Sequence, residues 1–353
     1  MSVRLVKNKE EIKKINDWRD PLYLNNLLTD KEKLIHKKAK DFCQSRLLPS
    51  VIEDNNKSYF DKKIYSDLGS NGFLGNTIKG YGSQNVSSVA YGLVAKELES
   101  VDSSYRSAIS VQSSLVIHPI YNFGSEEQKE KYIPELIKGN LIGCFGLTES
   151  VSGSDPSSME TNFEEVSDGY IINGSKNWIT NAPIADVFLI WAFSKEKKVH
   201  GFIIDRNTKG LTTEKINKSS IKIAQAGKIL LKNVKVPKSS ILPNTTGWKS
   251  IYSCINKARY GIAWGAMGAA ETCWLIAKDY AEKRIVNKKP LASKQLVQKK
   301  LADMMTEVSL GFGGCILAGR SMDEEKDLKI AISLLKRNNC RKALDIVRDA
   351  RDI

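Results

Sequence analysis

The chain has 353 residues, of which 41% are hydrophobic and 27% charged, and 54 Lys and Arg against 40 Asp and Glu give a formal net charge of +14. This length and composition are typical of a globular protein of two or three domains that buries sizeable cores. The six cysteines include no CxxC pair and the three histidines are well separated, which argues against a disulfide scaffold and against metal chemistry. No apolar run approaches the roughly 18 residues of a membrane span, so we expect no membrane insertion.

The positive charge favours an anionic partner such as a nucleotide, an acyl-CoA, a nucleic acid or a membrane surface, although lysine-rich solvated faces give the same excess. No block of Lys and Arg with interleaved aromatic residues is present. Net charge is thus the sole argument for a nucleic-acid-binding protein, and we expect no nucleic-acid partner. The first 13 residues carry four basic residues but also Glu10 and Glu11. Because transit peptides avoid acidic residues, this N-terminus is a poor transit peptide and composition leaves the compartment open.

Residues 29–140 are predicted to be mostly helical. Thr29 followed by Glu32 has the pattern of a capping box, and apolar residues then recur at helical spacing until Pro49, which ends that helix. A second helix is predicted to begin at Val86.

Two further helix starts follow. Asp102 or Ser103 is suited to cap a helix over 105–123, because both side chains can accept a hydrogen bond from a free backbone N–H. Ser125 begins another helix, with acidic residues in the first turn where the helix dipole favours them.

From about residue 142 the pattern changes to short runs rich in β-branched and aromatic residues, separated by Gly, Asn, Ser and Pro, as in a small barrel or sandwich. Helical periodicity returns at 247 in three long segments, 258–281, 293–322 and 327–352, which predict a bundle. The sequence therefore predicts an α+β protein. Its predicted parts are an N-terminal α-helical domain over 17–141, a middle β-barrel or sandwich domain over 142–240 and a C-terminal helical bundle over 247–353.

Three runs within the β-rich region combine glycine with small hydroxyl residues. They cover 143–149 (Gly-Cys-Phe-Gly-Leu-Thr-Glu), 152–160 (Ser-Gly-Ser-Asp-Pro-Ser-Ser-Met-Glu) and 173–181 (Asn-Gly-Ser-Lys-Asn-Trp-Ile-Thr-Asn). Glycine lets a ligand approach the backbone, and Ser and Thr supply compact hydrogen-bond donors. Such a surface is suited to bind a ring and a pyrophosphate.

These runs resemble the flavin-binding middle region of the acyl-CoA dehydrogenases, and among these most closely the glutaryl-CoA dehydrogenases. The resemblance extends from Asp17 to the end of the chain, and its most specific stretches include 77–82, 105–116, 258–265 and 335–345. It implies the acyl-CoA dehydrogenase fold, FAD as cofactor, a homotetramer, and an electron-transfer flavoprotein as partner.

The resemblance also implies roles for individual residues. Thr148 and Ser154 match residues that contact the flavin and its pyrophosphate, and Trp178 and Thr180 match a pair that lies along the isoalloxazine ring, where Thr180 can bond near N5 and the Trp178 ring shields one face. Without the resemblance, Trp178 would be interpreted as a buried strand aromatic.

Arg106 and Ser110 are four residues apart and so share one helix face, where a guanidinium fork and a hydroxyl can hold a carboxylate. In glutaryl-CoA dehydrogenases the matching pair holds the terminal carboxylate of the substrate, with a residue matching Glu99 in the same network. From the local sequence alone, Arg106 would be interpreted as a surface residue.

The remaining matches concern the rest of the two ligands. Asn256 and Arg259 match residues that bond the pantetheine and phosphate of acyl-CoA. Arg284 and Gln295 match residues that reach the adenosine end of a neighbouring subunit's flavin. Two segments depart from close relatives: Asn287-Lys288 stands where Phe-Gly is usual, and the loop 218–227 lacks an Arg, a Ser and a Thr.

The family's catalytic base is a Glu in a Tyr-Glu-Gly-Thr segment that follows a Gly-Gly-Asn-Gly turn, and neither occurs in these 353 residues. We therefore assign no catalytic residue, expect the base to lie beyond Ile353, and expect that the C-terminal bundle is truncated and that the chain as given does not turn over. A truncated gene model or fragment is favoured over a divergent copy that binds without turnover.

For the complete protein the resemblance implies FAD-dependent oxidative decarboxylation of glutaryl-CoA to crotonyl-CoA and CO2, as in lysine and tryptophan degradation in the mitochondrial matrix. The alternatives are another short-chain acyl-CoA dehydrogenase and a non-catalytic protein that binds flavin or acyl-CoA.

Overall fold

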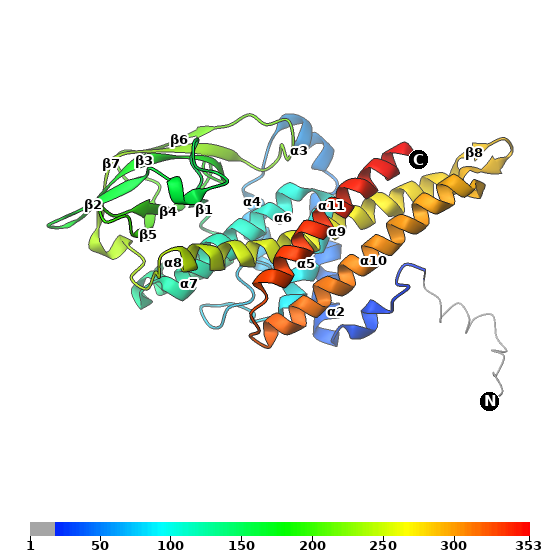
Figure 1. Ribbon diagram of the computed structural model, residues 1–353, viewed down its shortest axis with the longest axis horizontal. Helices are drawn as coiled ribbons and strands as arrows, with labels where there is room; N and C mark the ends of the chain where they lie inside the picture. The colour runs from blue at the N-terminus through cyan, green and yellow to red at the C-terminus, as the bar shows by residue number, and fades with distance from the viewer. Residues whose placement is uncertain (1–17) are drawn as a thin grey trace.

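The computed structural model describes residues 18–353. The stretch considered above as a transit peptide, and Asp17 at the start of the resemblance, lie outside the described residues. The β strands form one end of an elongated molecule, and the long helices extend from them to a hairpin at the opposite end (Figure 1).

Helices make up most of the structure before residue 139 and after residue 247. In chain order they are η1 (Leu24–Leu27), α2 (Asp30–Phe42), η2 (Cys43–Leu47), α3 (Val51–Lys57), α4 (Lys63–Ser70), α5 (Ser88–Val101), α6 (Ser103–Ser110), η3 (Val111–Ile117), α7 (His118–Phe123), α8 (Glu126–Lys138), η4 (Pro156–Ser158), η5 (Lys238–Ser240), α9 (Trp248–Lys283), η6 (Leu291–Ser293), α10 (Gln295–Asp323) and α11 (Lys329–Asp352).

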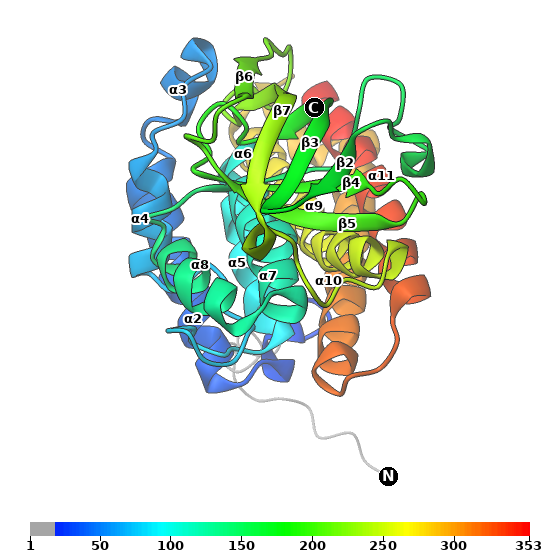
Figure 2. The same ribbon diagram turned by 90° about the vertical axis from the view of Figure 1, so that its left-hand side faces the viewer.

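The strands form a mixed seven-stranded sheet and one small hairpin. They are β1 (Gly143–Gly146), β2 (Asn162–Val166), β3 (Gly169–Thr180), β4 (Val187–Phe193), β5 (Val199–Asp205), β6 (Leu211–Lys215), β7 (Ala226–Pro237), β8 (Ile285–Val286) and β9 (Lys289–Pro290). The sheet order is β1-β4-β2-β3-β7-β6, with β5 paired to β4. Figure 2 shows β3 and β7 side by side, with α2, α4 and α8 to one side and α10 and α11 to the other. The predicted α+β class is confirmed.

Local capping explains why the first helices begin where the sequence predicts. Thr29 and Glu32 form the predicted capping box at the start of α2, and Ser125 forms one with Gln128 at the start of α8. The Asp102 carboxylate accepts a hydrogen bond from the Ser104 backbone N–H at 2.7 Å and so caps α6. The second helix begins at Ser88 rather than at the predicted Val86, since the Ser87 side chain forms the cap.

The helical part of the chain is joined to the sheet by one buried side chain. Gln112 in η3 donates from Nε2 to the carbonyl oxygens of Leu136 (2.9 Å) and Leu141 (2.7 Å). Its Oε1 accepts from the Gly143 backbone N–H at 2.9 Å, at the first residue of β1. This arrangement satisfies the end of α8 and fixes the start of β1, the strand that leads to Thr148.

The C-terminal helices pack along α9, which runs from the β end of the molecule to the β8–β9 hairpin (Figure 1). This helix starts at Trp248, ten residues before the predicted segment 258–281. Asn339 of α11 is fully buried and donates from Nδ2 to the Ala263 carbonyl at 3.0 Å, which fixes how α11 sits on α9.

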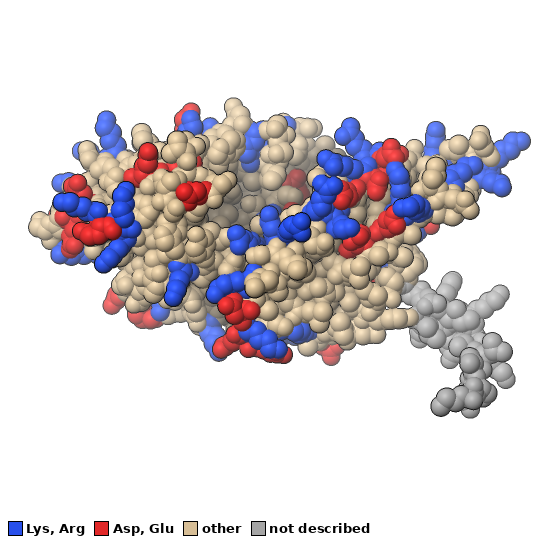
Figure 3. All heavy atoms as spheres, in the orientation of Figure 1, with Lys and Arg blue, Asp and Glu red and all other residues tan. Residues whose placement is uncertain are grey.

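One expectation about apolar runs requires correction. Within residues 18–353, α10 is the one helix that is long and apolar enough to cross a membrane by length and composition. Val308 and Phe312 on one face of α10 are buried in the main hydrophobic core, as in a bundle helix. The opposite face of α10 lies at the molecular surface, in an area with few charged side chains (Figure 3). Elsewhere on this surface of the molecule, acidic and basic side chains are interleaved.

An ion pair connects the N-terminal helices to α10. Glu32 accepts two hydrogen bonds from the guanidinium of Arg320, one at 2.5 Å and one at 2.6 Å, and another from the Ser87 hydroxyl. Burial acts to raise the pKa of Glu32, but these donors outweigh it and hold the pKa at about 2.

Replacing Glu32 by Gln should therefore lower the free energy of unfolding by about 1.5–3 kcal/mol at neutral pH. The folded-state pKa lies below the ordinary glutamate value of 4.5, so this contribution is complete above pH 4.5 and is lost as the pH falls toward about 2. Denaturant unfolding of both proteins between pH 7 and pH 3 should show the difference shrinking with acidity. Glu53→Gln, which removes the exposed pair with Lys57, is the control and should change little. A pH-independent difference would contradict this.

Candidate functional site

A cavity of about 380 Å³ lies between the edge of the sheet and the helices. Its β side is formed by Thr148, which follows β1, and by Trp178 and Thr180 at the end of β3. The opposite wall is mostly apolar and comes from η3, α9 and α11. The structure thus brings three of the six predicted flavin residues to one cavity of a size that suits a ligand.

The two threonines offer hydrogen-bonding groups to this cavity. Thr148 and Thr180 are half-buried, and among the described residues neither hydroxyl is hydrogen-bonded to another protein group. Ser154 lies close by in an exposed loop: a Cβ atom added at neighbouring Gly153 would be 3.8 Å from the Thr148 methyl carbon. The arrangement leaves compact donors available to a bound group.

Trp178 does not occupy the buried strand position that its local pattern indicates. The β3–β7 pairing shifts register between Lys176 and Ile179, and Trp178 lies in this irregularity with φ of 59°. Its side chain is 57% exposed. The Trp178 ring also borders a second cavity of about 370 Å³, lined by Ser107 and the loop 217–226. Side chains of a regular strand alternate between the two faces of the sheet, and a register shift changes the face on which a side chain lies. The shift between Lys176 and Ile179 therefore explains the outward position of the Trp178 ring.

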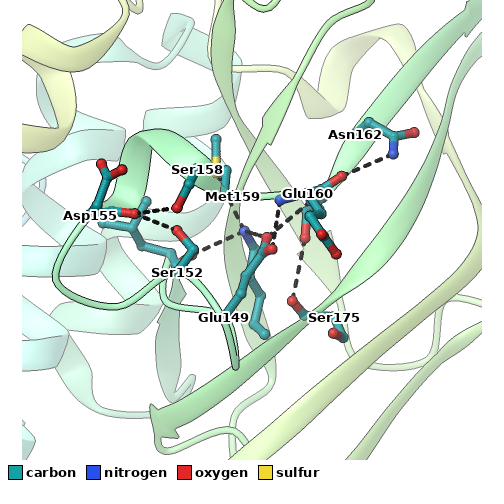
Figure 4. A network of polar contacts seen from close by, with 11 residues as sticks. Glu149, Ser152, Asp155, Ser158, Met159, Glu160, Asn162 and Ser175 are labelled. Atoms are coloured by element: carbon teal, nitrogen blue, oxygen red, sulfur yellow. Dashed lines mark hydrogen bonds and ion pairs between the residues drawn. The ribbon is translucent and has the colours of Figure 1, made fainter.

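The loop that carries Ser154 is held by a buried ion pair (Figure 4). Lys176 is fully buried, Glu149 is 5% exposed, and their Nζ and Oε1 atoms are 2.8 Å apart. Glu149 also accepts hydrogen bonds from the backbone N–H groups of Glu160 (2.7 Å) and Thr161 (3.0 Å). Ser152 donates to the Asp155 carbonyl at 2.7 Å.

For both Lys176 and Glu149, burial and the ion-pair contacts shift the pKa in opposite directions. Burial lowers the pKa of Lys176 to about 8 although Glu149 acts to raise it. Burial acts to raise the pKa of Glu149, but Lys176 and the backbone N–H donors keep it below the usual value. Glu149 is therefore a structural anion that fixes the loop.

Arg106 and Glu99 form a second buried ion pair. The Arg106 Nε and Glu99 Oε2 atoms are 2.5 Å apart, and the side chains are 12% and 9% exposed. Ser103 donates to the other Glu99 oxygen at 2.8 Å. The pair lies against Gly265 of α9, where a Cβ atom would be 1.8 Å from Glu99 Oε2 and 3.1 Å from Arg106 Cγ. Glycine at this position is what leaves room for the pair.

Neither Arg106 nor Glu99 lines the cavity, but the pair lies close to it along α9. Ile262 of α9 lines the cavity, and Gly265 follows three residues later, so the two share one face of the helix. Ser110 is buried at the end of α6, the helix that carries Arg106. The predicted carboxylate-binding residues are thus brought together, although Glu99 already occupies the Arg106 guanidinium.

The other predicted residues lie in two places. Arg259 lines the cavity and donates from Nη1 to Asn256 Oδ1 at 3.2 Å. Arg284 and Gln295 are exposed beside the β8–β9 hairpin, at the far end of the molecule from the sheet (Figure 1). The single chain does not bring these two residues to the cavity, and their predicted contact with a neighbouring subunit's flavin stays a prediction.

Two lysines of the site were not singled out from the sequence. Lys176 lies within the 173–181 run, but a lysine between polar neighbours gives no sign of burial. Lys336 of α11 lines the cavity and lies within the 335–345 stretch. The sequence feature that could have identified Lys336 is its position three residues before Asn339, the residue that anchors α11 on α9.

Comparisons with known proteins agree with this architecture. Residues 29–140, 144–234 and 245–353 match the N-terminal, middle and C-terminal domains of acyl-CoA dehydrogenases. A glutaryl-CoA dehydrogenase from Mycobacterium smegmatis, solved in complex with FADH2, superposes with a TM-score of 0.92 at 38% identity, over 96% of this chain and 88% of that one. Butyryl-CoA dehydrogenase from Megasphaera elsdenii gives a TM-score of 0.89 at 31% identity, over 92% and 88%. In sequence, the glutaryl-CoA dehydrogenase of Desulfococcus multivorans is 30% identical over 80% of this chain and 75% of its own length.

The fold and the cavity are those of an FAD-dependent oxidoreductase. The chain belongs to the acyl-CoA dehydrogenase family. Members of this family bind FAD, and the cavity fits that group, because Thr148 and Thr180 present free hydroxyls at its β side and the Ser154 loop lies beside them. The predicted fold and cofactor are therefore confirmed.

Proposed function

We propose that the substrate of this protein is glutaryl-CoA, which is oxidised and decarboxylated to crotonyl-CoA and CO2. The observation that carries the proposal is the buried Arg106–Glu99 pair at Gly265. A monocarboxylic acyl group has no charge for a guanidinium to bind, and burying an ion pair has a desolvation cost. A terminal carboxylate gives the buried guanidinium a function.

Different residues of this chain would bind the cofactor, the acyl chain and the distal carboxylate. FAD, when bound, supplies the acceptor for the hydride that leaves the β-carbon. Thr148, Thr180 and Ser154 would hold that cofactor, while the apolar wall of η3 and α9 would take the acyl chain and exclude water. Arg106 and Ser110 would orient the distal carboxylate, which leaves as CO2.

No carboxylate of the described residues lines the 380 Å³ cavity. Binding is therefore a more direct test than turnover.

The proposal includes an electron-transfer flavoprotein as electron acceptor, a homotetramer as the assembly and the mitochondrial matrix as the compartment. It also assigns Asn256 and Arg259 to the CoA moiety.

Glutaryl-CoA and butyryl-CoA provide a matched pair of ligands, since glutaryl-CoA is butyryl-CoA with a terminal carboxylate. Isothermal titration of the FAD-saturated protein should give at least about tenfold tighter binding of glutaryl-CoA at low ionic strength. Tighter binding of butyryl-CoA would favour another short-chain acyl-CoA dehydrogenase.

A further inference from the structure

We propose that Lys336 is a specificity residue that binds the distal carboxylate of the acyl group together with Arg106. This inference rests on the proposed function and adds to it a residue from α11, outside the predicted carboxylate-binding set. It follows from the charges that face the cavity, from the way α11 is anchored and from the neutralisation of Arg106.

The cavity lining contains two cationic side chains among the described residues, Arg259 and Lys336. Arg259 already donates to Asn256 and belongs to the end assigned to CoA. Lys336 is half-buried, and within residues 18–353 no ion pair joins it to a carboxylate. An ammonium beside an apolar wall is poorly hydrated, so an anionic ligand there gains more than it would in water.

The position of Lys336 is fixed rather than incidental. One turn along α11, Asn339 is fully buried and bonded to the Ala263 carbonyl of α9. Residues three apart on a helix lie on neighbouring parts of one face, so this bond sets the side of α11 that meets α9. Ile262, which precedes Ala263, lines the same cavity as Lys336.

The Arg106–Glu99 pair lies close to the same segment of α11. Burial raises the pKa of the Cys340 thiol, and Lys336, Glu99 and Arg106 are the charged groups near enough to influence it further. Lys336 and Cys340 are one turn apart, so the ammonium and the ion pair lie near the same segment of α11. Because Glu99 neutralises Arg106, the pair carries no net charge, and Lys336 supplies the excess positive charge that a carboxylate needs.

The test compares Lys336→Gln, Lys336→Arg and the unmodified chain in titrations with glutaryl-CoA and butyryl-CoA at saturating FAD. The ratio of the two dissociation constants isolates the carboxylate, because the CoA moiety and the four-carbon chain are common to both ligands. Lys336→Gln should lower the preference for glutaryl-CoA by about tenfold, and Lys336→Arg should keep most of it. Arg337→Gln removes the adjacent, exposed charge and should leave the ratio unchanged.

Flavin content and thermal unfolding of each variant show whether the effect is local. An unchanged ratio in Lys336→Gln, an equal loss of both ligands, or a loss of FAD would each overturn the inference. A failure of the proposed function is distinguishable from these results. In that case the unmodified chain itself shows no preference for glutaryl-CoA. This result would refute both the glutaryl-CoA assignment and the role of Lys336, without measurements on the variants.

Discussion

Replacing Arg106 by Gln should weaken the binding of glutaryl-CoA by at least about tenfold and change the affinity for butyryl-CoA much less. The Arg106 side chain is 12% exposed, so a carboxylate bound to it lies where water competes poorly. Butyryl-CoA lacks the carboxylate and never uses this contact. Isothermal titration with both ligands at saturating FAD measures the two losses separately.

The single substitution leaves Glu99 buried without its cation, which can disturb both ligands through the fold. The double variant Glu99→Gln/Arg106→Gln removes both charges and should restore thermal stability without restoring the preference for glutaryl-CoA. Arg106→Lys keeps a point charge but loses the planar fork, so it should retain part of the preference. An equal loss of both ligands in the double variant would show that Arg106 is structural and would remove the basis of the glutaryl-CoA assignment.

Replacing Lys176 by Met should lower the free energy of unfolding by about 3–5 kcal/mol and abolish stable FAD binding. The substitution leaves the Glu149 carboxylate 5% exposed without its ammonium partner. Glu149 also holds the backbone N–H groups of Glu160 and Thr161, so the loop with Ser154 loses its anchor. Denaturant unfolding measures the first effect, and flavin absorbance after gel filtration measures the second.

A matched control lies on the adjacent strand. Lys228→Met on β7 removes an ammonium 3.7 Å from Glu214 in a pair with both side chains exposed, and should change neither quantity. The double variant Glu149→Gln/Lys176→Met should be more stable than Lys176→Met, since no unpaired charge then remains buried. Unfolding of Lys176→Met at the same denaturant concentration as the unmodified chain would refute the structural role of the pair.

Local chemistry made much of the fold predictable. The capping residues Thr29 and Ser125 act on backbone groups within three residues, so their effect is visible in the sequence itself. The change from helical to strand periodicity near residue 142 likewise follows from side-chain patterns that extend over a few residues. The grouping of Thr148, Trp178 and Thr180 was predicted through the family resemblance, and the cavity confirms that they lie together.

The remaining features depend on residues distant in sequence. The outward position of Trp178 results from a register shift against β7, which an alternating pattern cannot reveal. The burial of Lys176 depends on Glu149, 27 residues away, and on their shared enclosure by the loop. The occupation of Arg106 by Glu99 requires α6 to turn back on α5 at Asp102, a geometry set by tertiary packing.

The missing side chain at Gly265 has an evolutionary consequence. Every glycine codon becomes an alanine codon through one base change, and the added methyl carbon would lie 1.8 Å from Glu99 Oε2. Since that distance is far inside van der Waals contact, Glu99 and Arg106 would both have to leave their present positions. A single point mutation on α9, at a residue without a side chain, would thus disrupt the proposed carboxylate-binding residues. Under the proposed function, one nucleotide change would thus be enough to remove the preference of this protein for a charged acyl group.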